Sequence, residues 1–534
     1  NVKISLAGGE SESRQLVLLP VIDTPVQVLV KTSDLVSGQQ ILPASQISFH
    51  RVGYLRIKEA PVGTRGGYWP DPLFPVNSLD LKDEPEVILL TVHAERNQPA
   101  GTYRGSLSFD TPEGKPVQKL DLVVEVFPFS LPERSPFRMD FCFSEHHIAS
   151  IYRQPLTPEF FRSCMEVMGQ YRLAAYPQLP TVMRNVVIYL ENDGELTFDF
   201  RGLEPYLKAA TEHGLNFINI SFTNHYQSLV HQFEKITAVR RDNGEKVTIL
   251  VTSPEQLTRK FLKEVTEYVL ERGWFTREEI YCDVIDEPWN EPARQALKKA
   301  AAAVREAVPF ARIYGAGTYK GMGVDGFIDT WVPQLRQFQP ENYQPGDEVW
   351  LYQCLYKVPF PTFTLNRPGL EVRTQFWINW KYRITGFLYW SSIYWGTSRD
   401  YSQLNQRPVR DFFVHPEWPV PFDGTDYVGD ALFFYPGPQG LLPGLRAVNI
   451  RDGVEDWEYL YLLGKLMEEA KKAGVAVPEE LMKESQSLLK VPEEAVASPR
   501  KFTDSPEMIE KTREKVAKLI IRWGKLLSTT RRGR

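Results

Sequence analysis

Short runs of alternating apolar and polar residues fill the first 132 positions. Three of them, "VQVLVKT" (26–32), "EVILLTVHA" (86–94) and "KLDLVVEVF" (119–127), are separated by stretches rich in Gly, Pro, Asn and Asp. A period of two, interrupted by turn residues, is typical of antiparallel strands. The pattern predicts an N-terminal β-sandwich over residues 1–132, followed by the proline-rich linker "PFSLPERSPF" (128–137).

From residue 137 onward, strand-like runs alternate with helical stretches. "NFINISFTN" (216–224) and "EIYCDVIDEP" (279–288) are apolar and β-branched, whereas "SPEQLTRKFLKEVTEYVLERG" (253–273) and "EPARQALKKAAAAVREAVP" (291–309) have the spacing of amphipathic helices. About eight such β-then-α steps predict a (β/α)8 (TIM) barrel. A doubly wound parallel sheet is the alternative.

We place the barrel at residues 137–424 and assign residues 425–534 to a C-terminal region, in which one or two closing strands precede a helical tail. The predicted fold is therefore a multidomain α/β and β protein. It consists of an N-terminal β-sandwich, a (β/α)8 barrel and a C-terminal strand and helical extension.

Composition narrows the possible partners. The 534 residues carry a net charge of −5 and no basic stripe beyond the terminal "RRGR", so nucleic acid is not expected as a partner. No apolar run approaches the roughly 20 residues that a bilayer span requires. The four cysteines lie far apart without zinc-type spacing, and we expect buried free thiols. We interpret the start at Asn1 as a trimmed mature or engineered end, which leaves the compartment open.

The run "EIYCDVIDEP" ends in two adjacent carboxylates, Asp286 and Glu287. Reacting groups of a (β/α)8 barrel stand at the carboxyl ends of its strands. Pro288 stops the hydrogen-bond ladder and favours an extended Glu287. We expect the strand to end here and to present both carboxylates at the barrel mouth. The alternative interpretation is a polar strand end whose Glu287 caps the following helix.

Two adjacent carboxylates suit one kind of glycoside hydrolysis. A conventional glycosidase places its two carboxyl groups about 5 to 9.5 Å apart, across the scissile bond. A neighbouring pair fits a scheme in which the 2-acetamido oxygen of the substrate attacks the anomeric carbon. Glu287 would then act as general acid and base, and Asp286 would orient the acetamido group. Two close carboxylates also raise one pKa, which suits a proton donor near neutrality.

The chain resembles glycoside hydrolase family 123 and the wider superfamily that carries domain of unknown function 4091. The resemblance covers nearly the whole chain. It rests on "YCDVIDEP" (281–288), "GFLYWSSIYW" (386–395), "LRAVNIRDGVEDWEYLYLL" (445–463), "GYWPDPLFP" (67–75) and "PAGTYRGSLSF" (99–109).

This resemblance implies an exo-acting, retaining β-N-acetylgalactosaminidase that works by substrate-assisted catalysis. The substrate would be a terminal β-linked N-acetylgalactosamine of a glycan or glycolipid. The catalytic pair of the family falls on Asp286 and Glu287, and no metal or organic cofactor is expected. Preference for the galacto or the gluco sugar stays open, because it depends on contacts to the 4-hydroxyl group.

Aromatic residues near strand ends are candidates for sugar contacts. Tyr352, in "EVWLYQCLY", is our first choice to donate a hydrogen bond to the acetamido oxygen. Trp390 and Trp395 are candidates for the sugar floor and the acetamido wall, with packing as the alternative for one of them. Trp331 is a further candidate.

Polar residues after two early strands are also candidates. Glu145, His146 and His147 follow the first predicted barrel strand, and Asn224 and His225 follow another. Adjacent residues rarely ligate one metal ion, so we interpret them as possible contacts to sugar hydroxyl groups.

Two arginines and a glycine-rich loop complete the candidates. Arg373 is a possible substrate contact, whereas Arg451 and Asp452 are better interpreted as a structural clamp between barrel and tail. The segment "GAGTYKGMG" (315–323) lacks the spacing of a nucleotide-binding loop and is interpreted as a loop above the pocket.

Two rival functions remain at this stage. One is a glycosidase of the same fold acting on another sugar, including β-linked N-acetylglucosamine or a sugar without the acetamido group. In the latter version Glu287 would pair with a carboxylate from another strand, such as Glu145. The other rival is a carbohydrate-binding protein that has lost catalysis.

Overall fold

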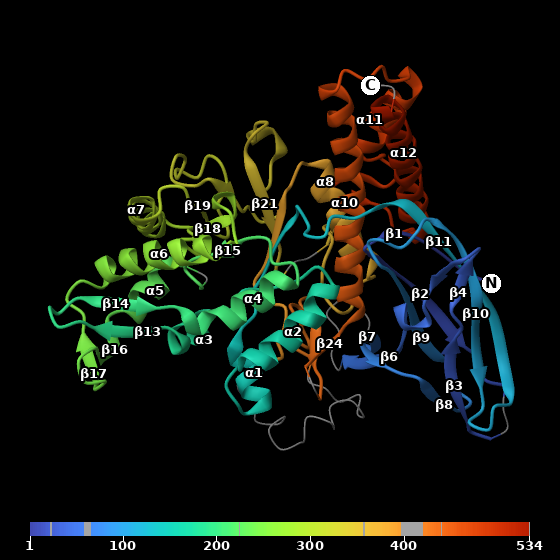
Figure 1. The fold of residues 1–534 in the computed structure, drawn as a ribbon, viewed down its shortest axis with the longest axis horizontal. Coiled ribbons are helices and arrows are strands. Elements are labelled where there is room, and N and C mark those ends of the chain that lie inside the picture. The colour runs from blue at the N-terminus through green and yellow to red at the C-terminus, as the bar shows by residue number, and fades with distance from the viewer. Residues whose placement is uncertain are drawn as a thin grey trace.

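The fold is described from a computed structural model of the chain. The structure describes residues 1–21, 24–57, 66–223, 225–355, 358–396, 420–438 and 440–532. The chain is a mixed α/β protein with several sheets. In Figure 1 the N-terminal sheets, the region of parallel strands and the C-terminal helices form three neighbouring parts.

Two N-terminal sheets share one hydrophobic core. In the first sheet the order is β1-β11-β10-β3-β8, with β4 on β10 and β5 on β4, and in the second it is β2-β9-β6-β7. All these pairs are antiparallel except β1 with β11. Alternate residues of both sheets, such as Leu6, Val30, Val92 and Leu107, are buried between them. The strands are β1 (Val2–Gly8), β2 (Glu10–Leu18), β3 (Val26–Thr32), β4 (Leu35–Ser37), β5 (Gln40–Leu42), β6 (Ile47–Ile57), β7 (Gly67–Pro75), β8 (Ser78–Leu81), β9 (Glu86–Ala94), β10 (Gly101–Asp110) and β11 (Pro116–Ser130), with the short helix η1 (Ala44–Gln46) before β6.

Seven short parallel strands form the centre of the molecule. They are β12 (Arg138–Phe141), β15 (Ile218–Asn219), β18 (Ile280–Asp283), β19 (Arg312–Tyr314), β20 (Thr330–Trp331), β21 (Glu348–Tyr352) and β22 (Gly386–Tyr389). They pair in the orders β15-β18-β19 and β12-β22-β21-β20, and a parallel bridge between Ala316 and Val332 joins the two sheets. The apolar run "RLAAYPQLP" (172–180) makes no ladder, although Leu173 and Tyr176 are buried there. Closure into a barrel therefore stays a prediction.

Helices follow most of these strands, as the periodicity of the sequence predicts. Pro254–Glu271 (α6) and Glu291–Ala307 (α7) lie within the two stretches expected to be helical. Asn290 begins α7 by accepting a hydrogen bond from the Ala293 N–H at 2.9 Å, as N-cap residues do. The other helices of this region are α1 (Glu145–Tyr152), α2 (Pro158–Gln170), α3 (Leu179–Asn185), α4 (Glu204–Glu212), α5 (Tyr226–Gln232) and α8 (Leu370–Lys381), with the short helices η2 (Arg201–Leu203), η3 (Arg277–Glu279) and η4 (Pro340–Asn342).

A mixed sheet, made of two antiparallel hairpins joined by the parallel pair β13-β16, interrupts the alternation of strands and helices. Its order is β14-β13-β16-β17, and it lies at the left edge of Figure 1, away from the N-terminal sheets. The strands are β13 (Val187–Leu190), β14 (Leu196–Asp199), β16 (Lys235–Arg240) and β17 (Lys246–Leu250). Each hairpin turns at a glycine with positive φ, Gly194 at 90° and Gly244 at 75°. The residue pairs Asp193-Gly194 and Asn243-Gly244 are the sequence signals for these hairpins, which we had not predicted.

The C-terminal helices pack on both other parts. Helix α10 (Leu445–Lys472) contacts α8 and α12 and also reaches β7 and β2 of the N-terminal sheets. Figure 1 shows it between the sheets and the parallel strands. The other elements are β23 (Phe434–Pro436), β24 (Leu441–Pro443), α11 (Glu479–Leu489), β25 (Val496–Ser498), β26 (Lys501–Phe502) and α12 (Pro506–Arg532).

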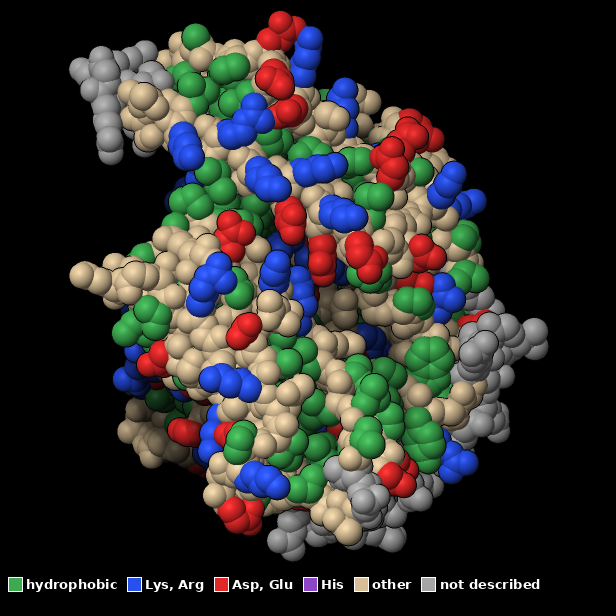
Figure 2. Space-filling view, turned by 90° about the vertical axis from the view of Figure 1, so that its right-hand side faces the viewer, with side chains coloured by type: hydrophobic (Ala, Val, Ile, Leu, Met, Phe, Trp, Pro, Cys, Tyr) green, Lys and Arg blue, Asp and Glu red, His purple; other side chains and the backbone are tan. Residues whose placement is uncertain are grey.

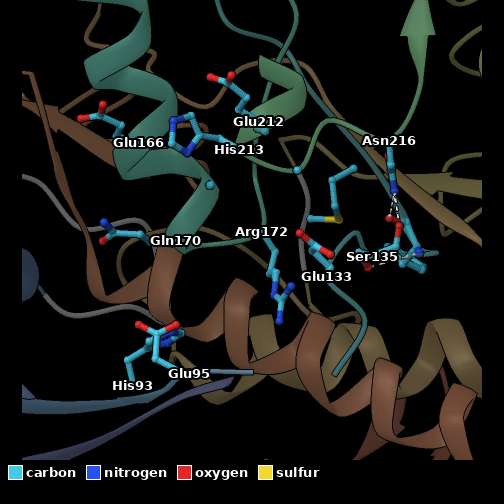
Figure 3. A pocket seen from close by; sticks show the side chains of 15 residues that line it. His93, Glu95, Glu133, Ser135, Glu166, Gln170, Arg172, Glu212, His213 and Asn216 are labelled. Atoms are coloured by element: carbon cyan, nitrogen blue, oxygen red, sulfur yellow. Dashed lines mark hydrogen bonds between the residues drawn. The ribbon is translucent and has the colours of Figure 1, made fainter. Parts of the chain in front are cut away.

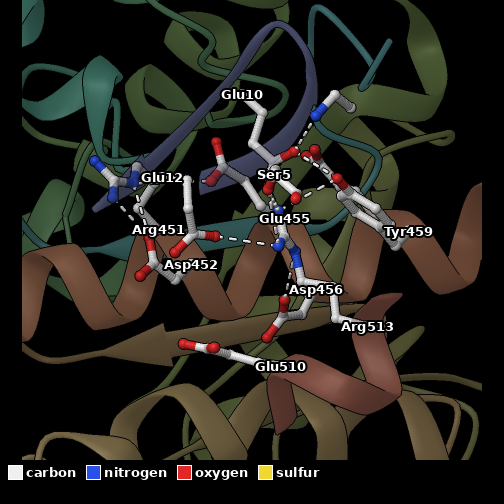
Figure 4. Close-up of polar contacts among 12 residues, drawn as sticks. Ser5, Glu10, Glu12, Arg451, Asp452, Glu455, Asp456, Tyr459, Glu510 and Arg513 are labelled. Atoms are coloured by element: carbon white, nitrogen blue, oxygen red, sulfur yellow. Dashed lines mark hydrogen bonds and ion pairs between the residues drawn. The ribbon is translucent and has the colours of Figure 1, made fainter. Parts of the chain in front are cut away.

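A buried network of ion pairs fixes this junction (Figure 4). Arg513 of α12 is paired with Glu10, with Glu12 at 3.2 Å and with Asp456 at 3.4 Å. Glu10 also accepts a hydrogen bond from the Tyr459 hydroxyl at 2.5 Å. Three parts of the chain far apart in sequence, β2, α10 and α12, therefore meet at one arginine.

The described surface carries mixed charge. On the face in Figure 2, acidic and basic side chains are interspersed rather than gathered into one patch. None of the helices in the described part of the chain is long and apolar enough to cross a membrane. The four cysteines, all within the described residues, form no disulfide bond; Cys164 and Cys282 are buried, and Cys142 and Cys354 are partly buried.

Candidate active site

The chain leaves the parallel sheet three residues before Asp286. Strand β18 ends at the buried Asp283, so the expectation that it runs to Asp286-Glu287 is wrong. Glu287 has a φ of 45°, which also contradicts the extended conformation expected before a proline. The Glu287 N–H donates to the Ala316 carbonyl at 2.9 Å, and the Trp289 N–H donates to the Glu287 carbonyl at 2.7 Å. These two bonds hold a strained backbone of the kind found at functional sites.

Two hydrogen bonds fix the Glu287 carboxylate. Its Oε1 atom accepts a bond of 2.6 Å from the Tyr352 hydroxyl, and its Oε2 atom accepts a bond of 3.1 Å from the Trp289 indole N–H. Tyr352 is the last residue of β21, so it brings a second strand end to Glu287. Burial, together with this bond to the carboxylate, raises the pKa of the Tyr352 hydroxyl well above its usual range. The hydroxyl therefore stays a proton donor at ordinary pH.

Asp286 stands beside Glu287 on the exposed side of the turn. Its pKa is raised, first because surrounding protein atoms remove water from the carboxylate and second because Glu287 lies close. Within the described part of the chain, no lysine or arginine forms an ion pair with either residue. The charge of Glu287 therefore raises the free energy of the ionised Asp286 without relief from a paired cation of the described residues.

A second group of acids lies beneath the pair. Asp140, at the end of β12, accepts hydrogen bonds from the Tyr314 hydroxyl at 2.7 Å and from the Tyr176 hydroxyl at 3.2 Å. Burial raises the Asp140 pKa to about 6. The pKa of Asp283 is also raised, by burial first and then by the charges of Asp140 and Asp286. The interior below the candidate site thus favours protonated carboxyl groups.

Trp390 is fixed by a buried aspartate. Asp430 accepts hydrogen bonds from the Tyr389 hydroxyl, from the Trp390 indole N–H at 2.9 Å and from the Leu355 N–H at 3.3 Å. The Trp390 ring lies 4.7 Å from the Tyr394 ring, centroid to centroid, and stays partly exposed. Cys354 lies between this group and the candidate pair, because burial first, and then the charges of Asp430, Glu287 and Asp286, raise the pKa of its thiol to about 12.

The other two predicted tryptophans are packed in the core. Trp395 is 0% exposed, and its indole N–H donates to the Phe434 carbonyl at 2.8 Å. Trp331 is 5% exposed in β20. The structure therefore brings Trp390 into the neighbourhood of the pair and leaves Trp395 and Trp331 as buried packing residues.

The three candidates after β12, Glu145, His146 and His147, also differ in exposure and contacts. The buried carboxylate of Glu145 is paired with Arg184 at 2.7 Å and accepts hydrogen bonds from Thr181 and from the Leu156 N–H. His146 is exposed, whereas His147 is buried with its ring 5.2 Å from Tyr394. Burial lowers the His147 pKa to about 4, so its imidazole is neutral.

Three further candidates remain, namely Asn224, His225 and Arg373. Asn224 lies outside the described residues. His225 begins α5 and accepts a hydrogen bond from the Ser228 N–H at 3.2 Å. Arg373 of α8 is 7% exposed and forms two hydrogen bonds to Asp456, at 2.7 and 2.8 Å. Arg373 therefore belongs to the junction with α10 rather than to the neighbourhood of Glu287.

Sequence reasoning missed Trp289 and Asp430 as members of this site. Trp289 directly follows the motif "DEP", and its exposure of 42% is unusual for a tryptophan. The place of Trp289 directly after this motif was the sequence signal that could have identified it. Asp430 lies 40 residues beyond Trp390, and no spacing rule connects the two.

The cavity in Figure 3 lies elsewhere, between the N-terminal sheets and the amino ends of the parallel strands. Its volume is about 860 Å³, and neither Asp286 nor Glu287 lines it. Figure 3 shows Glu166 and Gln170 of α2, Arg172 after that helix, and Glu133 and Ser135 of the linker around it. Across the described ranges, no three His, Cys, Asp or Glu side chains are grouped so as to hold a metal ion.

Comparison with known proteins defines the class. The family model of the glycoside hydrolase 123 catalytic domain matches residues 163–463, which is more than half of the chain, so the chain belongs to glycoside hydrolase family 123. This membership supports glycoside hydrolysis as the activity and a carbohydrate as the substrate.

One solved structure is similar over the whole fold. It is a family 123 glycoside hydrolase from Clostridium perfringens, studied for glycolipid glycan hydrolysis, with 14% sequence identity and a TM-score of 0.65. The match covers 99% of this chain and 95% of that one.

Other matched structures resemble only part of the chain. The N-terminal domain of PorA is 12% identical, with a TM-score of 0.14, and covers 24% of this chain and 87% of its own. Murine CRIg is 12% identical, with a TM-score of 0.13, and covers 23% and 91%. Among curated proteins, no sequence matched significantly.

Proposed function

We propose that the protein is an exo-acting, retaining β-N-acetylgalactosaminidase that hydrolyses terminal β-linked N-acetylgalactosamine by substrate-assisted catalysis. The observation that carries the proposal is the arrangement at the end of β18. There, Glu287 is held by Tyr352 and Trp289, and the adjacent Asp286 stays exposed without a cation. Family membership supports the same reaction class.

In the first step the acetamido oxygen of the substrate attacks the anomeric carbon and forms a new C–O bond. The bond from the anomeric carbon to the leaving-group oxygen breaks, and Glu287 transfers its proton to that oxygen. The product is an oxazolinium ion, or an oxazoline if the amide proton passes to Asp286. Asp286 accepts a hydrogen bond from the acetamido N–H and stabilises the positive charge that develops on the ring.

In the second step water attacks the anomeric carbon from the face that the leaving group has vacated. The bond from the anomeric carbon to the acetamido oxygen breaks, and Glu287 takes a proton from the water. The amide is restored, and the sugar leaves with its original configuration. Two inversions at one carbon account for retention.

Tyr352 and Trp390 have supporting roles in this proposal. The Tyr352 hydroxyl now donates to Glu287 Oε1, and it would donate to the acetamido oxygen when the sugar is bound. That exchange leaves Glu287 Oε1 free to carry the proton that the first step requires. Trp390, oriented by Asp430, would place its partly exposed ring against the apolar face of the sugar.

The contacts of Glu145 weigh against the rival mechanism. A conventional pair of carboxyl groups would need a second carboxylate across the scissile bond from Glu287. Glu145 was the candidate, but Arg184, Thr181 and Leu156 already occupy its carboxylate. We therefore favour the version in which the substrate supplies the nucleophile. The intact pair, Asp286 and Glu287, also weighs against a binding protein without catalysis.

The finer architecture is part of the same proposal. We infer that residues 1–132 form a β-sandwich, that the parallel strands close into a (β/α)8 barrel over residues 137–424, and that residues 425–534 complete and cover it. The shared core of the two N-terminal sheets supports the first inference. The parallel pairings and the bridge from Ala316 to Val332 support the second.

The test is hydrolysis of 4-nitrophenyl β-N-acetylgalactosaminide, beside its gluco isomer and the plain β-galactoside. We expect release from acetamido sugars only, with the galacto sugar preferred. Glu287→Gln and Asp286→Asn should each lower kcat/KM by about 100- to 10,000-fold. Glu291→Gln is the matched control, because it removes an exposed carboxylate at the start of α7 and should leave activity unchanged.

Inhibition by a thiazoline analogue of the oxazoline intermediate is a second test of the mechanism. It should inhibit the enzyme competitively if the acetamido group is the nucleophile. Turnover of the plain galactoside at a similar rate, or a Glu287→Gln variant as active as Glu291→Gln, would contradict the proposal.

A further inference from the structure

We propose that a pocket at the amino ends of three parallel strands binds a small aromatic anion, such as an aromatic carboxylate. The pocket has a volume of about 890 Å³, within the ordinary range for ligand sites, and lies between α8, α10, the end of α11 and the starts of β12, β21 and β22. Glu348, the first residue of β21, lines it, whereas Tyr352, the last, bonds to Glu287. The pocket and the candidate active site therefore lie at opposite ends of the same strand.

Aromatic side chains form one wall of the pocket and are fixed in place. Trp380 of α8 donates its indole N–H to the Leu489 carbonyl at 2.8 Å. On α10 the Tyr461 ring stacks on the Trp457 ring, with the centroids 5.6 Å apart and the planes 12° apart. The Trp457 and Trp380 rings meet edge to face, with the centroids 5.3 Å apart. Trp380 and Tyr461 stay partly exposed, so they offer aromatic surface to a flat ligand.

Four basic side chains line the same pocket, and none of them forms an ion pair with a described residue. They are Arg138, Lys381, Arg383 and Lys490. The Lys381 ammonium donates to the Val491 carbonyl at 3.0 Å, a neutral acceptor. The Arg138 guanidinium lies over the Tyr281 ring, 5.4 Å from its centroid, and makes one long hydrogen bond of 3.5 Å to the Pro136 carbonyl. These positive charges therefore lack a carboxylate partner among the described residues.

The two acidic side chains of the pocket have other cations as partners. Asp347 is paired with Lys320, and Glu348 is paired with Arg312 at 2.5 Å. Glu348 also accepts a hydrogen bond of 2.8 Å from the Tyr281 hydroxyl. The positive charge of the pocket is therefore left without compensation, and such a field attracts anions. A flat aromatic wall beside unpaired cations fits a ligand in which a negative charge is attached to an aromatic ring.

The experiment titrates 1-naphthoate into the full chain and measures binding by calorimetry. The matched ligand is 1-naphthamide, which has nearly the same shape and no charge. We expect naphthoate to bind at one site per chain with a Kd of about 0.1 mM, ordinary for a ligand of this size, and the amide to bind about 10-fold more weakly. Equal affinity for the two ligands, or no saturable binding of naphthoate, would overturn the proposal.

A double variant tests the charges of the pocket. Arg383→Gln with Lys490→Gln removes two exposed cations that line it. It should weaken naphthoate binding about 5-fold, the size of two exposed charge interactions, and leave binding of the amide unchanged. Lys483→Gln with Lys515→Gln is the matched control, because it removes two exposed lysines of α11 and α12 that do not line the pocket. An equal loss in the control would mean that net charge, and not this pocket, attracts the anion.

Two further variants test the aromatic wall and the location. Tyr461→Ser removes the stacked ring, so both ligands should lose affinity by a similar factor of about 5- to 10-fold. Unchanged affinity in this variant would refute the aromatic wall. Glu287→Gln should leave the naphthoate Kd as in the wild type, because Glu287 lies at the other end of the strands, so failure of the proposed function would not affect this result. A Kd that changes strongly in Glu287→Gln would place naphthoate at the candidate active site instead.

Discussion

Two clusters of acidic side chains in this protein have opposite electrostatic surroundings. At the junction of β2, α10 and α12, the acids Glu10, Glu12 and Asp456 surround Arg513, and all four are buried (Figure 4). At the end of β18 the acids lie near one another without a paired cation within the described ranges.

The difference shows in the pKa values. Arginine charges offset the cost of burial at Glu12, whose pKa falls to about 2. In the other cluster burial is unopposed by any cation, so the pKa values of Asp140, Asp283 and Asp286 are all raised. In the first cluster arginine charges keep Glu12 ionised, although burial still raises the pKa of Glu10. In the second cluster no paired cation among the described residues opposes the rise, so its carboxyl groups stay near the point of gaining or losing a proton.

The largest expected effect comes from removing the cation of the first cluster. Arg513→Met leaves Glu10 buried without its paired cation and leaves Glu12 with Arg14 alone, which should lower the free energy of unfolding by about 3 to 5 kcal/mol. Urea denaturation measures this loss as a shift of the midpoint of the first unfolding transition. Lys515→Met is the control, because Lys515 is exposed on the same helix. A loss equal to that of the control would show that the cluster is not a clamp.

The second effect is a pH dependence from Asp140. Its pKa of about 6 in the folded chain exceeds the ordinary value near 3.8, so the folded state binds the proton more tightly. The stability that Asp140 contributes should therefore be lost as pH rises from about 4 to about 6, which amounts to about 2 to 3 kcal/mol. In Asp140→Asn this contribution should disappear, whereas Asp283, whose pKa is also raised, keeps its own share of the fall.

Urea titrations at several pH values between 4 and 7 measure the effect. Asp504→Asn is the control, because Asp504 is exposed and its removal should leave the pH dependence as in the wild type. If Asp140→Asn keeps the full dependence, the interior does not favour a protonated Asp140.

The smallest effect concerns Asp286 and Glu287, the proposed catalytic pair. Glu287→Gln removes the like charge beside Asp286 and leaves its burial, so the Asp286 pKa should fall toward its ordinary value while staying above it. Carbon-13 NMR of the aspartate carboxyl groups follows this titration. Glu291→Gln should leave the Asp286 pKa unchanged. An Asp286 pKa that does not move in Glu287→Gln would mean that the two carboxylates do not interact.

The sequence by itself predicted the features that depend on local patterns. The apolar run before Asp286-Glu287, the helices α6 and α7 and the alternating N-terminal strands follow from spacing that each segment carries within itself. Arg451 and Asp452, interpreted from sequence as a clamp between barrel and tail, are neighbours on α10. Arg451 bonds to Asp452 at 2.7 Å and to Ser13 of β2 at 3.0 Å, so it joins α10 to the N-terminal sheets, while Asp452 lies 3.6 Å from Arg373 of α8.

Only the tertiary structure decided which residues surround the candidate pair. The run "YWSSIYW" carries aromatic residues on both sides of its two serines, so its sequence does not distinguish the partly exposed Trp390 from the fully buried Trp395. Arg373 looked like a substrate contact until its partner, Asp456, appeared 83 residues away. The positive φ of Glu287 depends on Ala316 of the next strand segment. Contacts between distant segments set these features, because local spacing fixes the period of an element but not which neighbour it meets.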